Sequence, residues 1–121
     1  GAVGVPIGDY GREALKNAGI LSAATANVVS NEADDASVVA KVSSGDADAG
    51  IVYVSDVSAA AGTQVRSVAI PSTDNVVATY PIAVVSGAAQ SATAQAFVTY
   101  VTGSAGQATL KTFGFAPPPT S

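Results

Sequence analysis

The sequence predicts an α/β fold in which helices pack on a mixed sheet. Short β-branched runs alternate along the chain with segments that carry apolar residues at helical spacing. Helix start and stop signals bracket most of the helical segments, and 48% of the 121 residues are hydrophobic while 12% are charged. Strands separated by helices are typical of a sheet with helices packed on it. Apolar surface this plentiful offsets the entropy of ordering, so we expect a folded chain.

The first strand and helix are expected near the amino terminus. Residues 2–5 form a short β-prone run that Pro6 ends. The spacing of apolar residues then predicts a helix over 9–18, with Asp9 as its N-cap and Gly19 just beyond its end.

The same pattern repeats in the next segment. Residues 28–29 are a second strand candidate, and an acidic stretch follows them. From residue 36 apolar residues mark a second helix face, with Asp34 or Asp35 capping its start and Gly45 closing it.

The rest of the chain continues the alternation. We expect strands at 49–54, 65–70 and 76–85, and a short helix over 55–61 after the first of them. A helix over 91–102 follows.

The last helix is expected to begin with a capping box. Ser104 and Gln107 have the spacing of that motif, and Gly114 ends the helix. Residues 116–121 read as a Pro-rich tail.

Composition excludes several kinds of chemistry. The chain has no His, Cys, Met or Trp, so thiolate and imidazole metal sites, disulfides and Ser/His/Asp or Cys nucleophile systems are excluded. The net charge is −4, and the five Lys and Arg residues are scattered rather than gathered in a basic stripe. Nucleic acid is therefore not an expected partner.

Three junctions between a strand and a helix stand out, over residues 5–10, 34–37 and 52–56. Backbone N–H groups at a helix start attract anions, and ligands of open α/β sheets gather at the carboxyl ends of strands. On the residues alone, turn formation and helix capping explain the first two junctions better. For Tyr53, at the third, a hydroxyl donor and a ring packed in the core are equally good explanations.

Acid/base and cation sites are the weaker alternatives. Asp9, Glu13 and Asp56 could supply a carboxylate pair, but no spacing brings two of them together. The acidic stretches 32–35 and 46–48 lack the calcium-loop pattern. We predict that the chain is not an enzyme, binds no metal ion directly and needs no cofactor.

Four segments together resemble a known family. They are residues 5–15, 42–56, 80–85 and 113–115. Their sequence motifs are, in the same order, V-P-x-G-x-Y, G-x-A-x-A-G-I-V-Y-x-S-D, Y-P-I-A-V-V and G-F. In this combination they look like the carboxyl-terminal half of the periplasmic molybdate-binding proteins of ABC importers. The resemblance covers nearly the whole chain except the tail.

The resemblance implies a periplasmic-binding-protein-like lobe of the class II type, incomplete relative to the two-lobed family fold. Residues 1–79 would belong to the second, anion-binding lobe, and residues 80–115 would return into the first. The missing amino-terminal half would complete the anion cage. A membrane permease would be the partner, and the location would be periplasmic or extracytoplasmic, with any lipid anchor on the absent amino terminus.

The resemblance also implies the site. A molybdate or tungstate oxyanion would be held by the backbone N–H groups of Ile7 and Asp35 and by the Tyr53 hydroxyl. The Asp35 carboxylate departs from the family pattern, since it would weaken binding unless it turns outward or caps its helix. Another tetrahedral oxyanion such as sulfate is an alternative ligand. A protein-interaction or self-associating module without a ligand is the alternative function.

Overall fold

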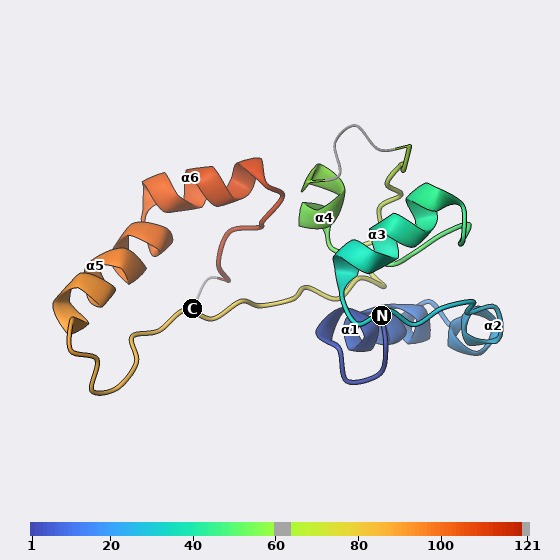
Figure 1. Cartoon of the computed structure of the whole chain (residues 1–121), viewed down its shortest axis with the longest axis horizontal. Helices are drawn as coiled ribbons and strands as arrows, with labels where there is room; N and C mark the ends of the chain where they lie inside the picture. Colours follow the sequence, from blue (N-terminus) through green and yellow to red (C-terminus); the bar gives the residue numbers. More distant parts are fainter. Residues whose placement is uncertain (60–63, 120–121) are drawn as a thin grey trace. The chain divides into compact units, whose positions relative to one another are not determined.

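In the computed structural model, residues 1–59 and 64–119 are described. The chain divides into two compact units, Gly1–Ala78 and Thr79–Ser121, and each is described by itself. The first holds α1 (Pro6–Asn17), α2 (Leu21–Ala26), α3 (Asp35–Ser44) and α4 (Val54–Ala59), and the second holds α5 (Ser91–Thr102) and α6 (Ser104–Thr112) (Figure 1).

Helix α1 begins three residues earlier than the sequence predicts. Pro6 occupies its first turn, where the ring fixes a helical φ and the missing N–H costs no hydrogen bond. Val5 is therefore at the N-cap position, and the prediction of Asp9 as N-cap is wrong. Asp9 instead lies in the first turn, and its carboxylate accepts a hydrogen bond from the Gly4 N–H at 3.2 Å.

The predicted helix ends are confirmed. Gly19, Gly45 and Gly114 follow α1, α3 and α6 with φ of +71°, +82° and +87°. This left-handed conformation is strained for residues that carry a Cβ, and it lets the chain turn away from the last helical carbonyls.

Helix α3 is capped as predicted. The Asp34 carboxylate accepts a hydrogen bond from the Ser37 N–H at 2.7 Å. Helix α4 matches the short helix expected after residue 54, and the predicted end at residue 61 lies outside the described residues.

Helix α2 was not predicted. It packs on α1, and three of its six residues are Ala. Val28 and Val29 follow it as exposed residues outside any strand, so the strand predicted there is wrong.

The mixed sheet is not confirmed, because no residue in 1–59 or 64–119 lies in a strand. The segments expected as strands, 2–5, 28–29, 49–54, 65–70 and 76–85, lie outside helices except at residue 54. A strand makes its backbone hydrogen bonds to a neighbouring segment and none within itself. The β-branched pattern therefore identified segments that lie almost entirely outside helices, without identifying a partner for them.

In the second unit, α5 confirms the helix predicted over 91–102, but the capping box at α6 is wrong. Gly103 holds the N-cap position, and the Gln107 side-chain amide donates to the Val101 carbonyl at 2.9 Å instead. Gly106 lies so close to the Tyr100 and Val101 carbonyls that a Cβ there would overlap them. This close approach forms the corner between α5 and α6. Residues 116–119 of the tail lie outside any helix.

The buried apolar side chains of the described residues are Ile7, Ala14 and Val38, all in the first unit. A Cβ on Gly50 would lie 2.5 Å from Val38, and one on Gly11 would lie 3.4 Å from Ile51. Helices α1 and α3 thus both pack against residues 50–51, which lead directly to the third junction.

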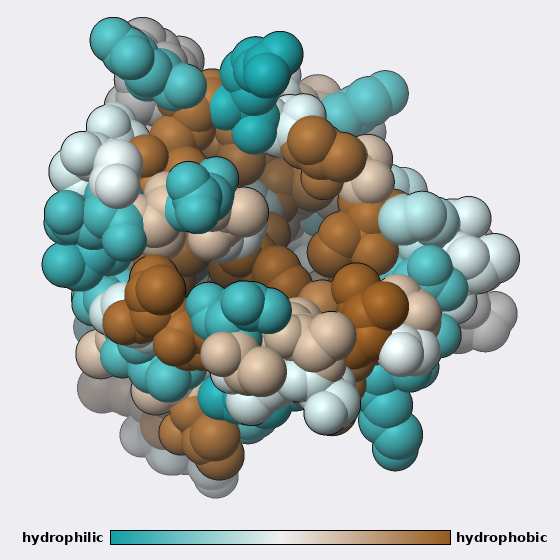
Figure 2. Space-filling model, turned by 90° about the vertical axis from the view of Figure 1, so that its right-hand side faces the viewer, coloured by the Kyte–Doolittle hydropathy of each residue, from teal (hydrophilic) through white to brown (hydrophobic). Residues whose placement is uncertain are grey.

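Large apolar side chains are exposed elsewhere, and Figure 2 shows apolar residues at the surface among polar ones. In the second unit Phe97, Tyr100 and Phe113 are each more than half exposed, while the rings of Tyr80 and Phe115 meet edge to face at 5.8 Å. None of the helices in the described ranges has the length and apolar character needed to cross a membrane.

Candidate functional site

The start of α1 presents backbone donors from a buried segment. Ile7 is the second residue of α1, and its side chain is 5% exposed. The first four N–H groups of a helix have no acceptor within the helix, so the Ile7 N–H is available to a group beyond the helix end. The next residue, Gly8, is buried where the loop of residues 1–5 passes over α1.

The start of α3 presents a second donor beside a carboxylate. Asp35 is the first residue of α3 and is half-buried. Its carboxylate accepts a hydrogen bond from the Ala36 N–H at 3.1 Å, so the side chain folds back onto its own helix start. The Asp35 N–H belongs to the first turn, whose donors lack acceptors within the helix.

Tyr53 immediately precedes α4 and is half-buried. Its backbone N–H donates to the Asp56 carboxylate at 2.7 Å. Its ring meets the Tyr10 ring of α1 edge to face, with centroids 6.5 Å apart and planes at 68°.

The three helix starts are connected to one another. Tyr10 and Tyr53 join α1 to the residue before α4. Asp35 and Asp56 interact between α3 and α4, which pack together. The loop before α1 also reaches the segment before α3, since the Ala2 N–H donates to the Glu32 carbonyl at 2.9 Å. The structure thus brings the junctions that carry Ile7, Asp35 and Tyr53 into one part of the first unit.

Electrostatics at this place are set by two carboxyl groups. Burial raises the pKa of Asp56, and the negative charge of Asp35 and a hydrogen bond with it raise that pKa further, against the lowering effect of the Tyr53 N–H. Sequence reasoning missed this pair, because it sought a partner for Asp56 in Asp9 or Glu13. The one available signal was that Asp35 and Asp56 both lie in the first turn of a helix.

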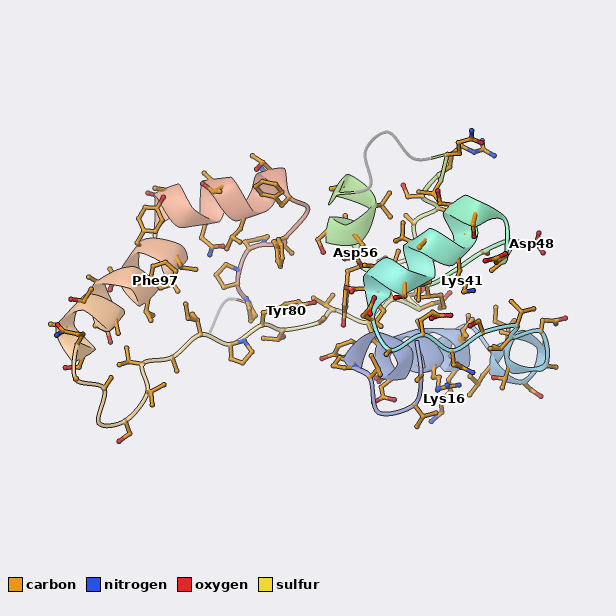
Figure 3. All side chains as sticks on the ribbon, viewed as in Figure 1. Lys16, Lys41, Asp48, Asp56, Tyr80 and Phe97 are labelled. Atoms are coloured by element: carbon orange, nitrogen blue, oxygen red, sulfur yellow. The ribbon has the colours of Figure 1, made fainter. Side chains whose placement is uncertain are left out.

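One cation of the first unit is already paired, and the side chain of another is partly buried. Lys41 pairs with Asp46 at 3.4 Å in an exposed ion pair, and Figure 3 shows Lys16 and Lys41 on α1 and α3. The Arg12 Nε is buried and has no hydrogen-bond partner among the described residues. Within the described ranges, no three His, Cys, Asp or Glu side chains gather in a way that could hold a metal ion.

The chain is similar in sequence to known bacterial binding proteins. Residues 2–116 match the family model of bacterial extracellular solute-binding proteins. The chain is also 46% identical over 92 residues to the molybdate-binding protein ModA of Mycobacterium tuberculosis (strain H37Rv) and to that of Mycobacterium bovis. The aligned region covers 76% of this chain and 35% of each relative, so the chain spans about a third of the length of the curated relatives it matches. No solved structure matches it.

Proposed function

Because the chain belongs to the family of bacterial extracellular solute-binding proteins, we propose that it is part of a receptor that captures molybdate or tungstate outside the cytoplasm. The family confirms the prediction of a binding protein rather than an enzyme. The similarity to two molybdate-binding proteins supports the choice of ligand.

The observation that carries the proposal is the gathering of three helix starts in one part of the first unit. In the proposed site, the N–H groups of Ile7 and Asp35 and the hydroxyl of Tyr53 donate to the oxygens of the anion. Oriented backbone N–H groups at helix starts stabilise negative charge without a full positive charge nearby. This agrees with a chain of net charge −4 in which Lys41 is already paired.

Neutral donors also suit a ligand that has to be released. A fully charged ion pair with a dianion would be strong in a low-dielectric site, whereas neutral hydrogen bonds of fixed direction select a tetrahedral shape at lower affinity. The Asp35 carboxylate is turned onto the Ala36 N–H, which leaves the Asp35 N–H as that residue's contribution to the anion.

Three donors leave part of a tetrahedral anion uncovered. The remainder of a longer receptor, corresponding to the amino-terminal half of the family fold, would supply the other wall. In this arrangement residues 1–79 belong to the anion-binding lobe and residues 80–115 return into the other lobe. A membrane permease of an ABC importer would receive the anion. The location would be periplasmic or extracytoplasmic, and any lipid anchor would lie on the amino-terminal part of the longer receptor.

Isothermal titration of a longer receptor that contains this chain tests the proposal. Molybdate and tungstate should bind with clear heats and sulfate should bind more weakly. Equal or absent heats for all three anions would contradict the proposal that the receptor captures molybdate or tungstate. The 121-residue chain by itself should bind molybdate more weakly than micromolar, because each charge-assisted hydrogen bond from a missing wall contributes about 1.5–3 kcal/mol.

A protein-interaction module is the second candidate function. The exposed Phe97, Tyr100 and Phe113 of the second unit favour it, since aromatic side chains this exposed are enriched where proteins associate. Light scattering would support this candidate if the mass rises with protein concentration and does not respond to oxyanions.

A further inference from the structure

One contact of Tyr53 acts on its backbone and another acts on its ring. Asp56 is the third residue of α4, and its carboxylate reaches back to the Tyr53 N–H at 2.7 Å. An acidic side chain at this position that accepts from the residue before the helix is one half of a capping box. The contact fixes the backbone of Tyr53 and therefore the direction of its Cα–Cβ bond.

The second contact acts on the ring. Tyr10 lies on α1 one turn after the buried Ile7, and its ring meets the Tyr53 ring at 6.5 Å and 68°. This edge-to-face arrangement is a favourable geometry for two aromatic rings. Tyr10 belongs to a helix that packs against residues 50–51, so its ring limits where the Tyr53 ring can lie.

We propose that Tyr10 and Asp56 are positioning residues that set where the Tyr53 hydroxyl lies. The inference rests on the proposed function, because it gives Tyr53 its task as an anion donor. A tyrosine hydroxyl stands at the far end of two rotatable bonds, so a change of rotamer moves it by several ångströms. With the backbone held by Asp56 and the ring held by Tyr10, the hydroxyl keeps one position without either residue touching the anion.

Matched variants separate the two contacts from general damage to the fold. Tyr10→Leu removes the ring contact, whereas Tyr10→Phe keeps it. Asp56→Ala removes the backbone acceptor, whereas Asp56→Asn keeps an acceptor oxygen and removes a charge. Tyr100→Leu, on the exposed side of α5, is the control for loss of a tyrosine elsewhere.

The first readout is the affinity for molybdate of the full chain, titrated into the millimolar range. Tyr10→Leu and Asp56→Ala should each weaken binding about tenfold, the effect of misplacing one hydrogen bond to a charged group. Tyr10→Phe should bind within about twofold of the wild type, and Asp56→Asn at least as well as the wild type. In the double variant Tyr10→Leu/Tyr53→Phe, affinity should equal that of Tyr53→Phe alone, because Tyr10 acts only through Tyr53. A purely structural Tyr10 would give additive losses.

The second readout does not need a ligand. The chain has no Trp and four Tyr, so its near-ultraviolet circular dichroism comes mainly from tyrosine. Tyr10→Leu should lose the same band as Tyr53→Phe, and Tyr100→Leu should keep that band. Unchanged affinity and an unchanged band in folded Tyr10→Leu and Asp56→Ala would overturn the inference. Absence of molybdate binding by a longer receptor that contains this chain would instead count against the proposed function, and the optical comparison would still decide whether Tyr10 orients Tyr53.

Discussion

The carbonyl oxygen of Ala2 lies so close to Gly8 that a Cβ on residue 8 would overlap that oxygen. The same Cβ would lie 2.7 Å from the Gly1 carbonyl oxygen. Both obstacles are backbone atoms, which cannot move aside as a flexible side chain can. The loop before α1 therefore depends on the absence of a side chain at residue 8.

Gly8→Ala should lower the free energy of unfolding by about 1–3 kcal/mol, since the overlap forces the loop or the helix to shift. Urea unfolding followed by circular dichroism measures this loss. Gly11→Ala in the same helix is the control, because its Cβ would meet Ile51 at an ordinary 3.4 Å. Equal stability of the two variants would contradict the close approach at Gly8.

Tyr53→Phe should weaken molybdate binding by about 1.5–3 kcal/mol, or roughly tenfold to a hundredfold, because it removes one hydrogen bond to a charged ligand. Isothermal titration gives the affinity. Tyr100→Phe removes a hydroxyl from an exposed tyrosine of the second unit and should leave the affinity unchanged. If Tyr53→Phe bound as tightly as the wild type, its hydroxyl would not be a donor to the anion.

Asp35→Asn should strengthen molybdate binding, because it removes a negative charge beside a bound dianion. The expected gain is about 1 kcal/mol, or roughly fivefold, and it should shrink as salt is added. Titration at two salt concentrations measures both effects. Asp48→Asn, at an exposed position beyond the end of α3, changes the net charge equally and should have the smaller effect.

The Asp34 cap of α3 should stabilise the fold more at neutral pH than in acid. The hydrogen bond from the Ser37 N–H lowers the pKa of Asp34. A lowered pKa in the folded state contributes stability that is present above the unfolded pKa and is lost as pH falls through the folded pKa. Asp34→Ala should therefore destabilise the chain at neutral pH and much less in strong acid. Thermal unfolding of both proteins across this range tests the difference.

Asp56 should make the chain less stable as pH rises. Its folded pKa is raised by burial and by Asp35, so between the unfolded and folded pKa the folded state binds more protons than the unfolded state. The free energy of unfolding then falls as pH rises through this window and stays lower above it. Asp56→Asn should remove that fall, which urea unfolding at several pH values between acid and neutral would reveal. A wild type and variant with parallel pH profiles would exclude the effect.

The sequence predicted local features better than pairings. Gly19, Gly45 and Asp34 act through neighbours a few residues away, and their helix ends and cap were predictable for that reason. The start of α1 lies at Pro6 and not at residue 9, where the apolar spacing placed it, because the preset φ of a proline suits the first turn of a helix. The predicted sheet depended on partners for each extended segment, and the pattern within a segment contains no information on its partner.

The same contrast holds at the candidate site. The residues chosen from the resemblance lie at helix starts, which is a local property. The pairing of Asp35 with Asp56 and the contact of Tyr10 with Tyr53 join residues 21 and 43 positions apart in the chain, and no local pattern in the sequence indicates them. These contacts follow from the packing of α1 and α3 against residues 50–51.

In the proposed site, the proline at the start of α1 has a consequence for the thermodynamics of anion capture. Its ring removes the freedom of the backbone just before the Ile7 N–H, so the entropy of orienting that donor is lost when the helix folds rather than when an anion arrives. Substitution of Pro6 would transfer that entropic cost to the binding step. The enthalpy of association would then stay nearly constant while its entropy became less favourable.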